Sequence, residues 1–194
     1  MSGKTTFVRT VGVNAVLAQT INTCLAAAYD APVLHVRSCI GRSDDLTSGK
    51  SYYIVEVEAD LAMVHASTGA DPHLFLLDEL FRGTNAIERI AGAEAVLTEL
   101  ILDGNRFKSH LVLAATHDGE LVELLSEIYM PYHFGDKLGP DGLIFDHRLR
   151  LGATTTRNAI ALLRLHRAPP AMVTRALQRA AVLDPRRGNA PVGR

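Results

Sequence analysis

Short apolar runs alternate along the chain with longer stretches in which apolar residues recur at helical spacing. This alternation is expected of a mainly parallel β-sheet covered by α-helices. The predicted strands span residues 33–37, 73–77, 111–115, 128–134 and 143–149. The last two are expected to form an antiparallel hairpin, because Pro140-Asp141-Gly142 supplies a turn between them.

The spacing of apolar residues also predicts five helices, at residues 4–29, 49–66, 86–103, 120–127 and 156–166. A short amphipathic helix at residues 172–183 follows Ala168-Pro169-Pro170, and residues 184–194 are expected to be a disordered tail. We therefore predict one α/β domain over residues 1–168 and a separate C-terminal segment over residues 169–194.

Composition narrows the class of protein further. Hydrophobic residues make up 47% of the 194 positions, which is enough for one sizeable core. A net charge of -1 provides no overall attraction to nucleic acid, so any DNA contact must be local or lie elsewhere. Cys24 and Cys39 lack the spacing of metal ligands and fit buried free thiols in a reducing cytoplasm. No apolar run is long enough to span a membrane.

The first six residues, Met1-Ser2-Gly3-Lys4-Thr5-Thr6, match the second half of the phosphate-binding loop Gly-x-x-x-x-Gly-Lys-Ser/Thr. The opening glycine of that pattern is absent. In such loops backbone N–H groups surround the phosphates, the lysine contacts the β and γ phosphates, and the hydroxyl binds magnesium. Lys4 and Thr5 would take these two roles, although Gly-Lys-Thr is a common tripeptide.

Two later strand ends carry candidate chemistry. Asp78 and Glu79 follow the apolar run at residues 74–77, where one acid can lie beside magnesium and the other can polarise an attacking water. The alternative is an acidic helix start, which the helix dipole favours. Thr116-His117 ends the strand at residues 111–115, and a histidine there can contact a γ phosphate or be purely structural.

A further candidate precedes the second predicted helix. Asp44-Asp45-Leu46-Thr47-Ser48-Gly49-Lys50-Ser51 combines small hydroxyl residues with a glycine, so its N–H groups could bind an anion or simply cap the helix. The four segments occur in the order expected of an ABC-type ATPase. That order predicts a P-loop NTPase fold with three layers, a mainly parallel sheet, a β-hairpin and a short C-terminal helix.

The amino-acid sequence of these segments resembles that of the ATPase domain of the MutS family of DNA mismatch repair proteins, over about residues 1–170. The segments that carry the resemblance are Met1 to Phe7, Asp44 to Ser51, Leu77 to Thr84, Ala115 to His117, Phe145 to Gly152 and Thr154 to Asn158.

The resemblance implies a site for ATP and Mg²⁺. Ser2, Gly3, Lys4, Thr5 and Thr6 would bind the nucleotide, and Thr5 would also bind the metal. Asp78 would be the acid on the metal side, Glu79 would orient the attacking water and His117 would sense the γ phosphate. Ser51 would reach the nucleotide of a partner subunit.

The resemblance also implies partners and a cellular setting. A homodimer would complete each site, and ATP would be coupled to clamping on mismatched or branched DNA. A MutL-type repair protein is a possible partner, and the setting would be cytoplasmic. DNA recognition would belong to upstream domains, and the chain would be truncated inside the phosphate-binding loop, without the first strand. The alternatives are a non-catalytic dimerisation remnant of the family, or another ABC ATPase, which would lack a Leu-Ser-Gly-Gly-Gln-like signature here.

Overall fold

The structure is a computed structural model that describes residues 3–41, 52–139, 142–154 and 158–183. These residues divide into two compact units. The first, called the sheet unit, comprises Gly3–Pro131 with Leu151–Ala153. The second, called the hairpin unit, contains residues 132–150 and the described residues from 154 onward.

A three-stranded parallel sheet forms the centre of the sheet unit. Its strands are β1 (His35–Cys39), β2 (His73–Asp78) and β5 (Leu111–Ala115), in the order β1-β2-β5. His35 is paired with His73 and Leu74 with Leu111, so the three strands end at the same edge of the sheet. β2 is the central strand, which explains its uninterrupted apolar run, because both of its faces are buried.

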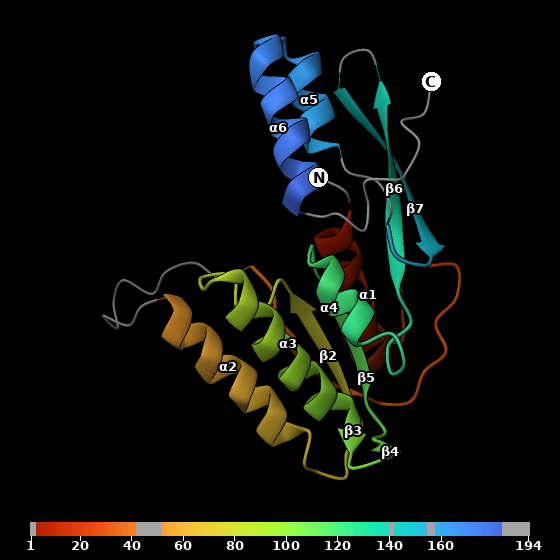
Figure 1. Cartoon of the computed structure of the whole chain (residues 1–194). Coiled ribbons are helices and arrows are strands. Elements are labelled where there is room, and N and C mark those ends of the chain that lie inside the picture. Colours follow the sequence, from red (N-terminus) through yellow and green to blue (C-terminus); the bar gives the residue numbers. More distant parts are fainter. Residues whose placement is uncertain (1–2, 42–51, 140–141, 155–157, 184–194) are drawn as a thin grey trace. The chain divides into compact units, whose positions relative to one another are not determined.

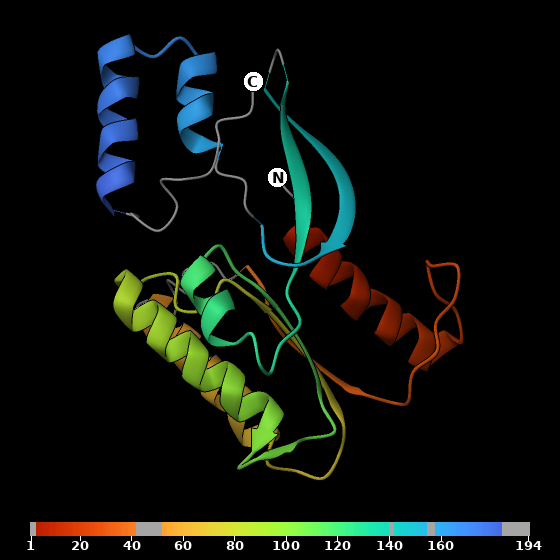
Figure 2. The same ribbon diagram turned by 45° about the vertical axis from the view of Figure 1, so that its right-hand side comes forward.

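Helices cover both faces of this sheet (Figures 1 and 2). Helix α1 (Lys4–Ile21) lies on one face, and α2 (Tyr52–Ala66), α3 (Ala86–Ile101) and α4 (Gly119–Leu124) lie on the other. Side chains alternate along β2: Leu74 and Leu76 join the core under α1, whereas Phe75 and Leu77 join the core under α2, α3 and α4. Each such fully buried side chain stabilises the fold by roughly 1.5–3 kcal/mol.

A glycine allows α1 to approach the sheet closely. Gly12 is buried, and a Cβ atom added there would lie 2.4 Å from Cδ1 of Leu76. The helix backbone therefore packs directly against the Leu76 side chain of the central strand, and this close approach helps to fix where the first residues of α1 lie.

The predicted elements of the sheet unit mostly agree with the structure. The strands at residues 73–77 and 111–115 are confirmed, and the first strand is displaced to His35–Cys39. The helix predicted at residues 4–29 is too long, because Asn22 adopts a left-handed backbone with φ of 52° and ends α1. Residues 102–103, predicted as the end of a helix, instead form β3 (Leu102–Asp103), which pairs with β4 (Arg106–Phe107) around a turn at Gly104.

In the hairpin unit, β6 (Tyr132–Gly139) pairs with β7 (Gly142–Leu151), as the turn at residues 140–142 predicts. The strand predicted at residues 128–134 begins too early, because the N–H of Tyr129 donates to the carbonyl of Leu125 and continues the turns after α4. Helices α5 (Ala159–Leu165) and α6 (Pro170–Leu183) pack against each other. The amide of Asn158 donates to Asp136 over 2.9 Å and ties the start of α5 to β6.

The fold class is confirmed in its coarse form: a mixed α/β chain with a parallel sheet, a hairpin and a C-terminal helix. The division at residue 168 stays a prediction, and the expected tail at residues 184–194 lies outside the described residues. Among the helices that the structure describes, none has the length and apolar content needed to cross a membrane.

Candidate functional site

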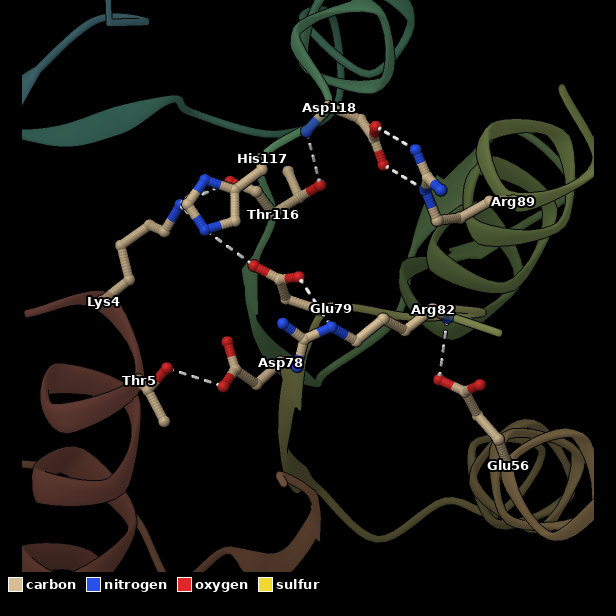
Figure 3. Close-up of polar contacts among 10 residues, drawn as sticks. All are labelled: Lys4, Thr5, Glu56, Asp78, Glu79, Arg82, Arg89, Thr116, His117 and Asp118. Atoms are coloured by element: carbon tan, nitrogen blue, oxygen red, sulfur yellow. Dashed lines mark hydrogen bonds and ion pairs between the residues drawn. The ribbon is translucent and has the colours of Figure 1, made fainter. Parts of the chain in front are cut away.

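The candidate site lies at the edge where the three parallel strands end. The start of α1 and the ends of β2 and β5 meet there, and Figure 3 shows five of the predicted residues facing one another. In open parallel sheets ligands bind beyond the carboxyl ends of the strands, so this edge is where a site is expected. The five residues are Lys4, Thr5, Asp78, Glu79 and His117.

Lys4 is the first residue of α1 and reaches across to the end of β5. Gly3 caps the helix with a φ of 98°, a left-handed conformation that glycine adopts without steric cost. The Nζ atom of Lys4 donates to the carbonyl of Thr116 over 2.9 Å and lies 3.0 Å from Nδ1 of His117. Partial burial lowers the pKa of Lys4 from its usual value, and the carboxylates of Glu79 and Asp78 oppose that shift.

Thr5 contacts the end of the central strand. Its hydroxyl donates to Oδ2 of Asp78 over 2.7 Å, and both side chains are partly buried. Asp78 is the last residue of β2, so the register of the sheet and the position of α1 bring these two oxygen-bearing side chains together. One hydroxyl and one carboxylate at this distance form a pair of hard oxygen ligands.

Glu79 extends the pairing of β2 by one residue and then turns the chain. Its N–H donates to the carbonyl of Ala115 over 2.9 Å, and its φ of 57° lies in the left-handed region. The carboxylate accepts from Nε2 of His117 over 2.8 Å and lies 3.6 Å from Nε of Arg82. Nε2 of His117 therefore carries the proton and Nδ1 is left to accept from Lys4, an assignment made from this hydrogen-bond network.

A cavity of about 230 Å³ adjoins these residues. It is lined by Glu79, Leu80, Arg82, Arg89, Thr116, His117 and Asp118.

Arg89 and Asp118 form a bidentate ion pair that the sequence analysis did not predict. Nε of Arg89 donates to Oδ2 of Asp118 over 2.8 Å, and Nη2 donates to Oδ1 over 2.7 Å. The Arg89 guanidinium holds the pKa of Asp118 below its usual range. The two residues are 29 positions apart, so no local spacing pairs them. The available signal was that each follows a motif, Asp118 directly and Arg89 within the helix after Asp78-Glu79.

The other predicted site residues stand apart from this group. Gly3 caps α1, and Thr6 is exposed on the first turn of that helix. Ser2, Ser51 and the loop at residues 44–50 lie outside the described residues.

The residues present fit magnesium and phosphate. Mg²⁺ in proteins takes one or two carboxylate or hydroxyl ligands and fills its remaining positions with water and phosphate oxygens. Thr5 and Asp78 provide that number of oxygen ligands. No group of three or more histidine, cysteine, aspartate or glutamate side chains suited to a metal occurs within the described part of the chain. Lys4 adds a positive charge beside them, at the N-terminus of a helix of 18 residues.

Comparison with known proteins identifies the family of the chain. Residues 1–184 match the family model described as MutS domain V. The chain is 37% identical over 179 residues to a DNA mismatch repair protein MutS 2 of Halobacterium salinarum, a match that covers 91% of this chain and 20% of the relative. It is 31% identical over 199 residues to a DNA mismatch repair protein MutS of Chlorobaculum tepidum, covering 100% of this chain and 22% of the relative.

The chain thus spans about a fifth of the length of these relatives. The family model covers nearly all of it, a range that includes the residues gathered at the carboxyl edge of the sheet. The chain belongs to the MutS family, within which it corresponds to domain V.

Proposed function

We propose that the sheet unit binds and hydrolyses ATP with Mg²⁺, as the ATPase part of a MutS-type DNA mismatch repair protein. The observation that carries this proposal is the meeting of Lys4, the Thr5–Asp78 pair and the Glu79–His117 pair at one edge of the sheet. The three-layer arrangement of α1, the parallel sheet and the helices α2, α3 and α4 supports a P-loop, ABC-type fold.

Each residue has a distinct part in the proposed reaction. Lys4 and the N–H groups at the start of α1 bind the phosphates, and Lys4 leaves Thr116 and His117 when it does so. Thr5 and Asp78 hold Mg²⁺. The bound metal supplies positive charge that neutralises the phosphate oxygens. Glu79 accepts a hydrogen bond from the attacking water and orients it, and His117 contacts the γ phosphate from the same edge of the sheet, beyond the end of the neighbouring strand β5.

The proposal extends to partners. The relatives are named as DNA mismatch repair proteins, and we propose that this chain serves a protein of that kind, coupling ATP to clamping on mismatched or branched DNA. Ser51 would complete the site of a partner subunit in a homodimer, and a MutL-type protein and a cytoplasmic setting belong to the same proposal.

The experiment measures Mg-ATP binding by calorimetry and phosphate release by the chain. Lys4→Ala should weaken ATP binding by tenfold or more, because it removes the cation beside the phosphates, at roughly 1.4 kcal/mol per factor of ten. Glu79→Gln should leave binding within about twofold and reduce turnover by about a hundredfold, because an amide cannot act as a base toward water.

Matched controls lie at the other end of the same unit. Lys108→Ala and Glu99→Gln alter a lysine and a glutamate that contact each other there, 4.0 Å apart, and should change neither binding nor turnover. If the chain shows no saturable Mg-ATP binding, or if Lys4→Ala binds as tightly as the parent chain, the proposed ATPase function is wrong. A non-catalytic, dimerising chain would then be the better description.

A further inference from the structure

His117 is held in place by its backbone neighbours rather than by packing of its own side chain. The side chain of His117 is 71% exposed, so few atoms other than those of Glu79 and Lys4 restrict its ring. Its orientation toward Glu79 must therefore come largely from the course of the chain on either side of it. On one side Thr116 follows the last residue of β5, and on the other Asp118 precedes α4.

Asp118 is anchored through both its side chain and its backbone. Its carboxylate accepts two hydrogen bonds from Arg89 of α3, and its N–H donates to Oγ1 of Thr116 over 3.0 Å. Two parallel hydrogen bonds fix direction as well as distance. The pair is well shielded from water, with 27% of the Arg89 and 19% of the Asp118 side chain exposed. The turn that presents His117 is therefore tied to α3.

The same helix is connected to Glu79. The segment that follows Glu79 leads directly into α3, whose first turn is capped by Asn85, the side chain of which accepts from the N–H of Glu88 over 3.0 Å. Thr84 strengthens that turn by donating to the Glu88 carboxylate over 2.7 Å. The start of α3 is thus linked to both residues of the Glu79–His117 contact. It follows Glu79 closely in the chain, and its Arg89 binds Asp118 next to His117, as Figure 3 shows.

We propose that Arg89 and Asp118 are a positioning pair that holds His117 in hydrogen-bonding contact with Glu79. The pair touches neither phosphate nor metal in this proposal and acts only through the turn it fixes. Its role in hydrolysis rests on the proposed ATPase function, whereas its effect on the Glu79–His117 contact does not. Lysine cannot replace Arg89, because an ammonium group lacks the planar pair of donors that the two oxygens of Asp118 accept.

The first test needs no nucleotide. Nitrogen-15 and carbon-13 spectra of the His117 ring report its tautomer and hydrogen bonding in the intact chain. Arg89→Met should shift the ring signals of His117, because the turn is released and the bond to Glu79 lengthens. Arg89→Lys should shift them in the same direction, and Asp118→Asn, which keeps the size of the side chain and one acceptor, should shift them less.

The control is Lys108→Met, which removes another shielded cation from the same unit. The Nζ atom of Lys108 donates to Oγ of Ser67 over 3.1 Å. Lys108 precedes β5, whereas His117 follows it. The His117 signals should not change in this variant. The proposal is overturned if they remain unchanged in both folded Arg89→Met and Asp118→Asn, or if Lys108→Met shifts them equally.

Turnover supplies the second readout. Where the parent chain hydrolyses ATP, Arg89→Met should lower kcat by about tenfold, as expected for a misplaced catalytic contact, and leave the Kd for ATP within about twofold. An equal loss in Kd and kcat contradicts a positioning role. A parent chain without hydrolysis overturns the proposed function, and the spectra still decide whether the pair positions His117.

Discussion

The two ends of the three-stranded sheet carry similar residues and use them in different ways. His110 precedes β5 and His117 follows it, so one strand places a histidine at each end. Nδ1 of His110 accepts from the backbone N–H of His73 over 3.2 Å, and Nε2 donates to the carbonyl of Ser67 over 3.0 Å. His117, in contrast, contacts the side chains of Glu79 and Lys4.

The partners of these histidines reveal what each end contributes. At the amino end the rings of His73 and Phe75 are stacked with centroids 5.2 Å apart, and His110 meets both edge-on. The hydrogen bonds of His110 to backbone groups there stabilise the fold, and breaking them leaves shielded polar atoms unpaired. At the carboxyl end the bonds join exposed or half-buried side chains, which can exchange them for a ligand without disturbing the sheet.

The largest expected effect comes from removing, in turn, each of the two histidines that flank β5. His110→Ala should lower the free energy of unfolding by about 2–3 kcal/mol, because it leaves an unpaired N–H and a gap beside Phe75. His117→Ala should change it by less than about 0.5 kcal/mol, since that side chain is mostly exposed. Urea denaturation followed by circular dichroism measures both. Equal losses would show that the two ends contribute alike.

A smaller effect on the free energy of unfolding is expected near the carboxyl end of the sheet, where Gly92 of α3 packs against the buried ring of Phe81. Phe81 has a φ of 55° and is buried, and a Cβ added at Gly92 would lie 3.1 Å from its ring. Gly92→Ala should therefore destabilise the chain by about 1 kcal/mol, although alanine is the better helix former. In a Phe81→Ala background the same change should stabilise it. Stabilisation of the parent chain by Gly92→Ala would refute this packing argument.

The smallest expected effect is a dependence of stability on pH at the amino end. Burial is the main cause of a lowered pKa for His73, opposed by its hydrogen bond to the carbonyl of Asp71, and nearby His110, Arg37 and His35 lower it further. Between the folded pKa and the unfolded value of 6.5, the unfolded chain binds more protons, so stability must fall as the pH falls. Unfolding in urea at pH 7 and pH 5 should show a smaller drop for His73→Phe than for the parent chain. Parallel drops would exclude His73 as a source.

Sequence patterns located the core strands because their signals were unambiguous. The run at residues 74–77 is apolar throughout, and its two faces are covered by different helices. The end of α1 could not be located, because Ala26-Ala27-Ala28 continues a helical composition whereas Asn22 turns the backbone. The apolar residues near Tyr129 suit a strand equally well, yet the Tyr129 hydroxyl donates to the carbonyl of Leu97 and serves the helical core.

The candidate site was predictable to the extent that each of its residues lies within a short motif. Lys4, Asp78 and His117 each lie at an element end that the sequence indicates, and parallel strands bring such ends together. The roles of these residues stay predictions. The pairing of Arg89 with Asp118 could not be predicted, because it depends on how α3 and α4 pack, which no local pattern encodes.

The close approach of Gly12 to Leu76 constrains which sequences can adopt this fold. A glycine inside a helix costs about 1 kcal/mol relative to alanine, so substitution at this position is favoured by helix propensity alone. Any side chain there meets Leu76 unless that leucine becomes smaller. Positions 12 and 76 are therefore expected to vary together during evolution, a glycine with a large residue and an alanine with a smaller one. Such covariation in aligned sequences would indicate how closely α1 packs against the sheet, without a structure.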